Sequence, residues 1–411
     1  MIPPGYKQTE VGVIPEEWGV KTFEKLFSFS GGYPASRDQL SSEGHCYLHY
    51  GDIHGATKTT VDVRADLRNI PKLNIPLKRV ASKSLLEDGD VVFVDASEDD
   101  EGTSRHVVVV NKEKKPFISG LHTIVAKSET DDLVHEYRRY CFQTDTIRKQ
   151  FLFYAVGTKV TGISKANIAK LKLPIPTLPE QRAIATALSD VDALLAALDR
   201  LIAKQRDLKQ AAMQQLLTGQ TRLPGFTGKW ETKTLGEITD SLDNLRVPLN
   251  ESQRERMKGD YPYCGANGVL GFVDNYVVDD DIILMAEDGG YFDEYETRPI
   301  AYRMTGKCWV NNHAHILKAK PGSDQGYLFY SLVHKNILPF LASGTRAKLN
   351  KSEMNKIEIR RPKDLPEQTT IATVLSDMDL ELAALEQRRD KTRALKQGMM
   401  QELLTGRTRL L

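Results

Sequence analysis

Two stretches of the chain carry the same helical pattern of hydrophobic positions. Within residues 178–223 the apolar residues are spaced alternately four and three apart, and the same spacing returns within residues 365–410. The first set is Ile184, Leu188, Val191, Leu195 and Leu198, and the second is Ile371, Leu375, Met378, Leu382 and Leu385. This spacing is typical of a coiled-coil seam, so each stretch predicts a long helix that buries one stripe.

The two stretches are copies of each other. Aligned with a shift of 187 positions, they are identical at 29 of 46 residues. Each opens with LPEQ, whose proline (Pro179, Pro366) suits a first helical turn, and each closes with LLTG, whose glycine (Gly219, Gly406) suits a helix end. About 38 residues at about 1.5 Å per residue give a rod of roughly 55 Å, longer than one globular core requires.

A single amphipathic helix would ordinarily pack on its own globular module. Two similar seams in one chain favour packing against each other, as an antiparallel intramolecular coiled coil. Burial of each aliphatic side chain contributes about 1.5–3 kcal/mol, so a few layers suffice to hold the pair. Beyond Leu198 we expect the apolar stripe to drift to Leu201 and Leu208 in the first helix and to continue through Leu395 in the second.

The regions outside the helices predict two globular modules. A chain of 411 residues exceeds what one hydrophobic core usually supports. Short runs such as VVFV and IILM alternate with glycine-rich turns, which indicates mixed α/β modules with curved antiparallel sheets and a pseudo-twofold arrangement. The predicted segments are a first module (1–177), a first helix (178–222), a second module (223–364) and a second helix (365–411).

The modules share a few anchor residues but little else. Trp18 corresponds to Trp230, and His122 corresponds to His313. The first helix is followed by a short segment that leads to Trp230. After the second helix the given sequence ends, and the corresponding segment, which leads to Trp18, stands at the beginning of the chain. The sequence therefore resembles a circle cut once, and we expect the two termini to adjoin.

Basic residues gather at equivalent places in the two modules, although the net charge is only +1. Residues 138–172 hold eight basic side chains against one acidic, and residues 333–363 hold eight against two. A single basic run is usually a solvated face. Its recurrence at matching positions favours nucleic-acid binding.

A Gly-Thr-basic step precedes a short predicted helix in each basic segment. Glycine permits close approach of backbone to a ligand, threonine offers a donor, and a helix N-terminus attracts phosphate. The alternative is an ordinary turn. The DNA-binding candidates are Gly157, Thr158, Lys159 and Lys165 in the first module, and Gly344, Thr345, Arg346, Lys348 and Lys351 in the second.

Signatures of catalysis are missing from the sequence. It contains no GxxxxGK[ST] loop, no GxGxxG after a strand and no Pro-Pro-aromatic methyltransferase box. Asp99, Asp100 and Glu113 could be forced into a metal-dependent nuclease site, but the second module lacks their counterparts. His122 and His313 are expected to be structural.

Cofactor and compartment signals are equally sparse. Four cysteines without a CxxC pair suggest neither a zinc site nor a disulfide framework, and no metal or cofactor is expected on this chain. No apolar run is long enough to span a membrane or to serve as a signal peptide, so we expect a cytoplasmic protein.

Two features together resemble a known family. The helices are duplicated and run from LPEQ to LLTG, and the two divergent modules open with an IPxxW-like and a GxW-like motif. This combination resembles the specificity subunit of a type I restriction-modification enzyme. The resemblance covers essentially the whole chain. It implies target-recognition domains that each read one half of a split DNA site, and a coiled coil that docks two methyltransferase subunits before restriction and translocase subunits join. S-adenosylmethionine, ATP and magnesium are then expected in the partner subunits. The second copy departs from the pattern at Arg388 and Arg389 in the seam and enters through Lys363 and Asp364.

The residues and the resemblance lead to one functional expectation. Two readers held by a rod should recognise two base clusters separated by an unread spacer, with half-sites about 34–36 Å apart. A stand-alone metal-dependent nuclease and a DNA-independent assembly scaffold remain alternatives. The bases that are read stay open, since Arg37, Lys58, Arg64, Arg254, Asn275 and Arg298 are all candidates for direct readout.

Overall fold

The computed structural model describes residues 2–56, 58–97, 104–157, 161–342 and 347–410. By internal contacts the chain divides into two compact units. Unit 1 comprises residues 1–197 and 389–411, and unit 2 comprises residues 198–388. Each unit therefore contains one globular module and one part of each long helix.

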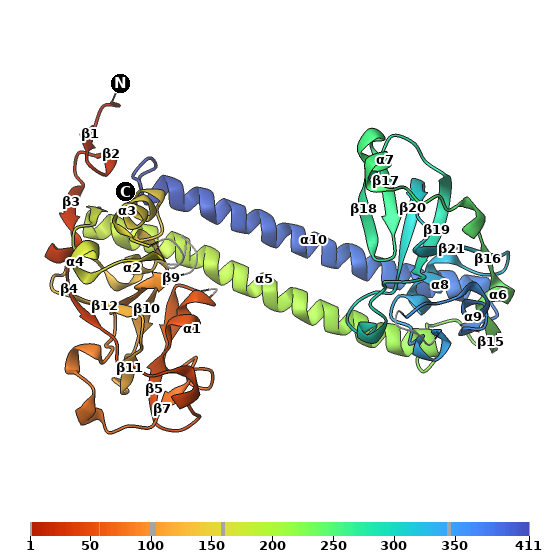
Figure 1. Cartoon of the computed structure of the whole chain (residues 1–411), viewed down its shortest axis with the longest axis horizontal. Coiled ribbons are helices and arrows are strands. Elements are labelled where there is room, and N and C mark those ends of the chain that lie inside the picture. The colour runs from red at the N-terminus through yellow and green to blue at the C-terminus, as the bar shows by residue number, and fades with distance from the viewer. Residues whose placement is uncertain (1, 57, 98–103, 158–160, 343–346, 411) are drawn as a thin grey trace. The chain divides into compact units, whose positions relative to one another are not determined.

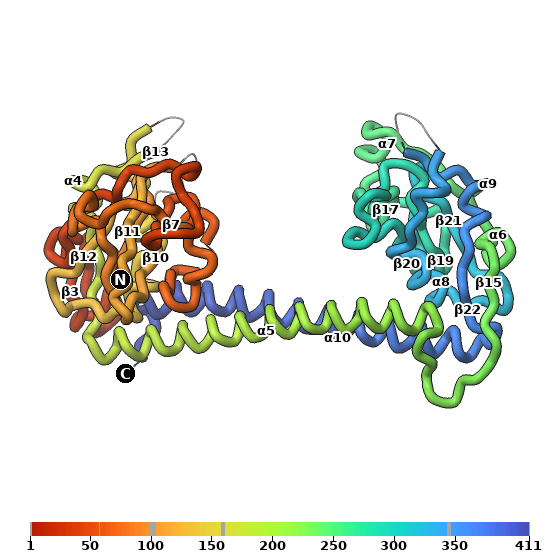
Figure 2. The backbone as a smooth tube through the Cα atoms, turned by 90° about the horizontal axis from the view of Figure 1, so that it is seen from below, coloured from red at the N-terminus to blue at the C-terminus, as the bar shows by residue number. Residues whose placement is uncertain are grey.

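The two long helices are α5 (Leu178–Thr218) and α10 (Leu365–Leu403). They lie side by side, as Figures 1 and 2 show. In unit 1 the beginning of α5 contacts the end of α10, and in unit 2 the end of α5 contacts the beginning of α10. The helices are thus antiparallel, which confirms the intramolecular pairing that the duplicated seam predicts.

Unit 1 is built on a five-stranded sheet in the order β4-β12-β8-β10-β6. Its strands are β4 (Phe27–Gly31), β6 (Thr60–Asp62), β8 (Val91–Val94), β10 (His106–Val110) and β12 (Thr123–Ser128). Neighbouring strands are antiparallel except β10 and β6, which are parallel.

Smaller elements surround this sheet. A three-stranded sheet contains β11 (Phe117–Ser119), β5 (His45–Leu48) and β7 (Lys72–Leu73). The two-stranded pairs are β1 (Tyr6–Thr9) with β2 (Gly12–Pro15), β3 (Gly19–Thr22) with β14 (Lys172–Ile175), and β9 (Ala96–Ser97) with β13 (Thr161–Gly162). The helices are α1 (Tyr50–His54), α2 (His135–Cys141), α3 (Asp145–Tyr154) and α4 (Lys165–Ile168).

Unit 2 has a six-stranded sheet in the order β16-β21-β19-β20-β17-β18. Its strands are β16 (Thr239–Ser241), β17 (Tyr261–Gly265), β18 (Gly268–Val273), β19 (Val278–Ala286), β20 (Ala301–Val310) and β21 (Ala314–Ala319). The pair β15 (Trp230–Thr234) and β22 (Glu358–Pro362) leads into and out of the module. Its helices are α6 (Leu235–Ile238), α7 (Glu251–Arg256), α8 (Gln325–Leu332) and α9 (Lys351–Met354).

The two sheets share one topology. The order β4-β12-β8-β10-β6 corresponds to β16-β21-β19-β20-β17, and the single parallel pair falls at the same place in each. Thr123 pairs with Val94 in unit 1, and Ala314 pairs with Ala286 in unit 2. His122 and His313, each one residue earlier, are therefore equivalent, as their matched sequence positions predict.

Each central strand is buried on both faces, which explains its continuous apolar sequence. In β8, Val91 and Phe93 pack with residues of α2, α3 and α5, while Val92 and Val94 pack with β5, α1 and β11. In β19, Ile283 packs toward α8 and α10, on the face opposite a second cluster of buried residues. The long helices thus complete one core in each unit.

The seam runs through both helices, but its second half differs from our expectation. Ile184, Leu188, Leu198, Ile371, Leu375 and Leu382 are buried, whereas Val191, Leu195, Met378 and Leu385 are half-buried. The prediction that the stripe drifts to leucines was wrong, since Leu201, Leu208 and Leu395 are 41%, 47% and 61% exposed. Ile202, Gln205 and Lys209 continue the four-three spacing in α5, and Arg389, Thr392 and Lys396 continue it in α10.

Among the residues that the structure describes, no helix is both long and apolar enough to cross a membrane. All four cysteines are buried free thiols.

Candidate nucleic-acid interface and its helical frame

The glutamate of the first LPEQ motif is a buried carboxylate bound by the other repeat. Glu180 accepts hydrogen bonds from Arg409 Nε at 2.5 Å and Nη2 at 2.9 Å, and from the indole nitrogen of Trp18 at 2.8 Å. Bidentate arginine–carboxylate pairs combine strength with directional specificity. In turn, the carboxylate raises the pKa of the Arg409 guanidinium. The segment after α10 is thereby fixed to the first turn of α5.

The second LPEQ motif forms the reciprocal contact within unit 2. Glu367, which is fully buried, accepts from Arg222 Nε at 2.5 Å and Nη2 at 2.7 Å. The guanidinium lies 5.7 Å from the ring centre of Trp230. The Trp230 indole nitrogen is buried and has no hydrogen-bond partner within the described ranges. Both helix starts are thus bound by the Thr-Arg-Leu segment that follows the opposite helix.

The glutamine of each LPEQ motif holds the module itself. The Gln181 side chain accepts from the backbone nitrogen of Val134 at 3.0 Å and donates to the carbonyl of Asp132 at 2.7 Å, just before α2. Gln368 similarly accepts from the backbone nitrogen of Asp324 at 3.0 Å, just before α8. The Glu-Gln dipeptide of each repeat therefore makes two connections. Its glutamate binds the segment that follows the opposite helix, and its glutamine binds the globular module of the same unit.

A Tyr-Asp-Lys triad joins module and helices in each unit. In unit 1 the Tyr140 hydroxyl donates to Asp192 at 2.8 Å, and Lys396 Nζ lies 2.7 Å from the other carboxylate oxygen. In unit 2 the Tyr330 hydroxyl donates to Asp379 at 2.7 Å, and Lys209 pairs with the same carboxylate. Each lysine also lies over its tyrosine ring, at 5.6 Å and 5.5 Å from the ring centres.

These triads account for the polar half of the seam. Lys209 and Lys396 occupy seam positions, where their aliphatic stems are partly buried and their ammonium groups reach acids of the opposite helix. Gln205 likewise donates to Glu381 at 2.9 Å. The arginine that departs from the apolar pattern, Arg389, has a side chain only 22% exposed and pairs with Asp390. Polar seam positions are known to fix register in coiled coils.

The structure places part of the predicted DNA-binding set. Gly157 is exposed with φ of 145°, a conformation that favours glycine, and Lys165 and Lys351 are exposed in the first turns of α4 and α9. Lys348 instead pairs with Glu287 at 2.8 Å. The other candidates, Thr158, Lys159, Gly344, Thr345 and Arg346, lie outside the described residues.

The equivalent histidines each pair with an aspartate. His122 Nδ1 lies 3.3 Å from Asp95, and His313 Nδ1 lies 2.6 Å from Asp288. Both imidazoles are nearly half exposed, at 48% and 42%. They lie where the chain returns from the Gly-Thr-basic segments, since β9 pairs with β13 and Asp288 bridges to Lys348.

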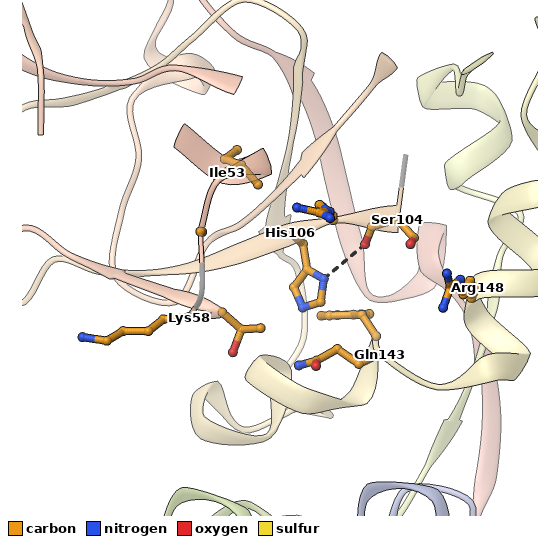
Figure 3. A pocket seen from close by; sticks show the side chains of 10 residues that line it. Ile53, Lys58, Ser104, His106, Gln143 and Arg148 are labelled. Atoms are coloured by element: carbon orange, nitrogen blue, oxygen red, sulfur yellow. Dashed lines mark hydrogen bonds between the residues drawn. The ribbon is translucent and has the colours of Figure 1, made fainter. Parts of the chain in front are cut away.

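Unit 1 also contains an electropositive cavity of about 390 Å³. Figure 3 shows His106 in it, with Nδ1 3.4 Å from the carbonyl oxygen of Ser104. Burial lowers the pKa of His106 to about 4, and its Nε2 has no partner among the described residues. The cations on the wall are Lys58, Arg105 and Arg148. The cavity thus combines a neutral imidazole with positive charge.

Comparison with known families identifies the family to which the chain belongs. The type I restriction modification DNA specificity domain matches residues 15–205 and 227–393, one match for each module and its helix. The chain belongs to this family. The two matches correspond to the duplication that the sequence and the sheet topology show independently.

Individual relatives carry the same description. A type I restriction enzyme specificity subunit from Haemophilus influenzae is 36% identical over 153 residues, which is 37% of this chain and 38% of that protein. The MjaX specificity subunit from Methanocaldococcus jannaschii is 22% identical over 98% of this chain and 97% of its own length. The first similarity is stronger but local, and the second is weaker but spans both modules.

A solved structure shares the fold. The S subunit of a type I restriction-modification system from M. genitalium aligns with a TM-score of 0.61 at 17% identity, over 94% of this chain and 96% of that one. At this identity the likeness concerns the fold alone. It supports the arrangement of two mixed α/β modules with paired long helices.

Of the three residues named for the nuclease alternative, the structure describes only Glu113. Asp99 and Asp100 lie outside the described residues, and Glu113 pairs with Lys115 at 2.9 Å and with Arg64 at 3.6 Å. No group of three or more potential metal ligands occurs among the residues that were described.

Sequence reasoning missed the partners of the LPEQ glutamates. A glutamate in a first helical turn is favourable through the helix dipole alone, yet Glu180 and Glu367 are fully buried salt-bridge partners. Their arginines were visible in the sequence as the retained Thr-Arg-Leu after each LLTG. A glutamate and an arginine that recur together in both copies were the available signal.

Proposed function

We propose that this chain is the DNA-specificity subunit of a type I restriction-modification enzyme, in which each module reads one half of a bipartite site. The observation that carries the proposal is the occurrence of one sheet topology twice, each time attached to the same antiparallel helix pair by the same contacts. Modules with a shared frame and different surface sequences are suited to read two different half-sites.

The DNA-facing region of each module would lie around its Gly-Thr-basic segment. In unit 1 the exposed Gly157 begins this segment and the exposed Lys165 follows it, and in unit 2 the exposed Lys351 follows it. Backbone contacts from such groups would position the module, while divergent loops would supply the base contacts. We retain Thr158, Lys159, Gly344, Thr345 and Arg346 as DNA-binding candidates.

Partner subunits would supply the chemistry. We propose that the helix pair docks two methyltransferase subunits, that restriction and translocase subunits join them, and that these partners carry S-adenosylmethionine, ATP and magnesium. Leu194, Leu201 and Leu208 support a docking role, because they recur every seven residues on α5 and are 40%, 41% and 47% exposed. The chain itself would be non-catalytic and would act in the cytoplasm, where its DNA substrate is found.

The helix pair would also set the spacer between half-sites. Inserting seven residues after Ala197 in α5 and seven after Arg388 in α10 preserves the four-three spacing and lengthens both helices by about 10 Å. The preferred spacer should lengthen by up to about three base pairs, at about 3.4 Å per base pair. The half-site bases should stay unchanged, which provides an internal control.

The decisive experiment is methylation mapping. Single-molecule sequencing of DNA from cells that express the chain with its methyltransferase partner should reveal one split motif. A nuclease would instead cut DNA with magnesium when purified alone, and a scaffold would show no salt-dependent DNA affinity. A continuous motif, or no motif at all, would contradict the proposal.

A further inference from the structure

The two modules share a hydrogen-bonded junction where the chain returns from the Gly-Thr-basic segment. In unit 1 the Asp95 amide donates to the His122 carbonyl at 3.2 Å, and the Ile163 amide donates to the Asp95 carbonyl at 2.8 Å. In unit 2 the corresponding bonds run from Glu287 to the His313 carbonyl at 2.9 Å and from Leu349 to the Glu287 carbonyl at 2.7 Å. We name these two sites the loop-base junctions.

Each loop-base junction carries a His-Asp side-chain pair, but the aspartate comes from a different position. In unit 1 the partner of His122 is Asp95, which itself makes the backbone bonds of the junction. In unit 2 that backbone position is Glu287, and the partner of His313 is the next residue, Asp288. The same side-chain pair is thus assembled twice from different positions.

At the first loop-base junction the backbone of His122 has an unfavourable conformation. His122 has φ of 57°, one of two positive values among the described non-glycine residues. Such conformations are unfavourable for a residue with a Cβ and cluster at functional sites. Neither imidazole is buried, so the conformation does not serve to fill a core.

The chemistry of the pair defines what the outer edge of the imidazole can bind. An aspartate at Nδ1 accepts a hydrogen bond, so Nδ1 carries the proton. No partner for Nε2 occurs in the described part of either module. In its protonated form such an imidazole donates from both nitrogens, to the aspartate on one side and to an acceptor oxygen of a ligand on the other.

We propose that His122 and His313 each bind a phosphate of the DNA backbone beside the half-site that their module reads. A feature present in both modules cannot distinguish two different half-sites, whereas the phosphate backbone is the same at both. The exposed cations Lys165 and Lys351 begin short helices right after the loop-base junctions and favour an anionic ligand there. This inference rests on the proposed function, since it names the part of the DNA that these residues contact.

The test compares the full-length protein, assembled with its methyltransferase subunits, with a His122→Asn/His313→Asn variant. Asparagine tolerates positive φ and can still reach the aspartate, but it is too short to replace Nε2. DNA affinity should fall by about tenfold or more for each histidine, equally on cognate and random duplexes. The slope of log affinity against log salt should decrease in magnitude by about 0.9 for each lost contact.

A matched variant and a chemical probe make the result specific. His313→Gln places an uncharged donor near the original Nε2, so it should recover part of the affinity but not the salt slope. Duplexes with single methylphosphonate linkages remove one phosphate charge at a time. Neutralising the contacted phosphate should weaken the wild type but not the asparagine variant, and this coupling can be read even if the variant is less stable.

The outcomes separate this inference from the function on which it rests. If the wild type binds its split site and the asparagine variant binds equally well with the same salt slope, the inference fails alone. A loss confined to the cognate sequence would assign the histidines to base reading and would also overturn it. If the wild type shows no salt-dependent DNA affinity, the proposed function fails as well.

Discussion

The two buried glutamates allow a prediction that depends on one hydrogen bond. Replacing Arg409 or Arg222 with methionine leaves a carboxylate with 0% side-chain exposure and no charged partner. Breaking a buried ion pair in this way costs about 3–5 kcal/mol. Glu180 would retain the indole N–H of Trp18, at 2.8 Å, whereas Trp230 makes no hydrogen bond to Glu367.

The remaining hydrogen bond makes the two losses unequal. A hydrogen bond to a charged group contributes about 1.5–3 kcal/mol. Arg222→Met should therefore destabilise unit 2 by about 1.5–3 kcal/mol more than Arg409→Met destabilises unit 1. Because a chain with two units need not unfold in a single transition, the measurement must be local. Hydrogen exchange in the first turns of α5 and α10 reports each opening free energy separately.

A double variant provides the matched control. Arg409→Met/Trp18→Phe removes the remaining donor to Glu180, so its local destabilisation should approach that of Arg222→Met. Adding Glu180→Gln to Arg409→Met removes the unpaired charge and should recover part of the loss. Equal losses in the two single variants, or a larger loss for Arg409→Met, would refute the role assigned to the indole.

Three further predictions follow from the same contacts. Tyr140→Phe and Tyr330→Phe each remove a hydroxyl that donates to a helix aspartate. Each should lower the local unfolding free energy by about 1.5–3 kcal/mol in hydrogen exchange, because the acceptor is charged. No effect of either substitution would count against the triads. Burial lowers the pKa of His106 to about 4, so unfolding takes up a proton between about pH 4 and about pH 6.5. The neutral imidazole therefore contributes fully to the stability of unit 1 above about pH 6.5. This contribution is lost as the pH falls toward 4, and the loss amounts to at most about 3 kcal/mol. The opening free energy of β10, measured by hydrogen exchange and corrected for the intrinsic exchange rate at each pH, should depend less on pH in His106→Gln than in the wild type. An unchanged profile would exclude His106 as the source. A circular permutant that joins Leu411 to Met1 and opens at the exposed Gly225 should fold and direct methylation of the same split motif. The reason is that residues near the two ends already contact each other: Tyr6 donates to the Gly406 carbonyl at 2.9 Å, and Arg409 pairs with Glu17 at 2.9 Å. A folded permutant that no longer binds its methyltransferase partner would contradict this prediction.

Sequence reasoning predicted those features that depend on a repeated local pattern. The alternating spacing from Ile184 to Leu198 predicted helix, and its repetition from Ile371 predicted the antiparallel pairing. The match of His122 with His313 predicted their equivalent places beside the central strands. In each case the signal is a local pattern that the second copy repeats.

Contacts between single side chains distant in the chain were not predicted. The contact of Glu180 with Arg409 spans 229 positions, and that of Arg222 with Glu367 spans 145. A glutamate in a first helical turn is favourable on local grounds alone, which hid its role as a buried partner. The sequence around His313 likewise did not indicate whether Glu287 or Asp288 would pair with this histidine, because that choice depends on how the chain leaves β19.

The seam shows why apolar residues alone were a misleading guide. Leu201 and Leu208 are more hydrophobic than Gln205 and Lys209, yet the leucines are exposed and the polar residues lie on the seam. The four-three spacing continues without interruption from Ile184 through Lys209, so periodicity predicts the buried face better than hydrophobicity does. The polar positions also have an energetic consequence. A uniformly apolar seam tolerates a shift of one heptad, whereas Lys209 and Lys396 find their aspartates in one register only. Register, and with it any spacing that the helices impose on two DNA-reading modules, would then be specified by the residues that look least suited to a coiled coil.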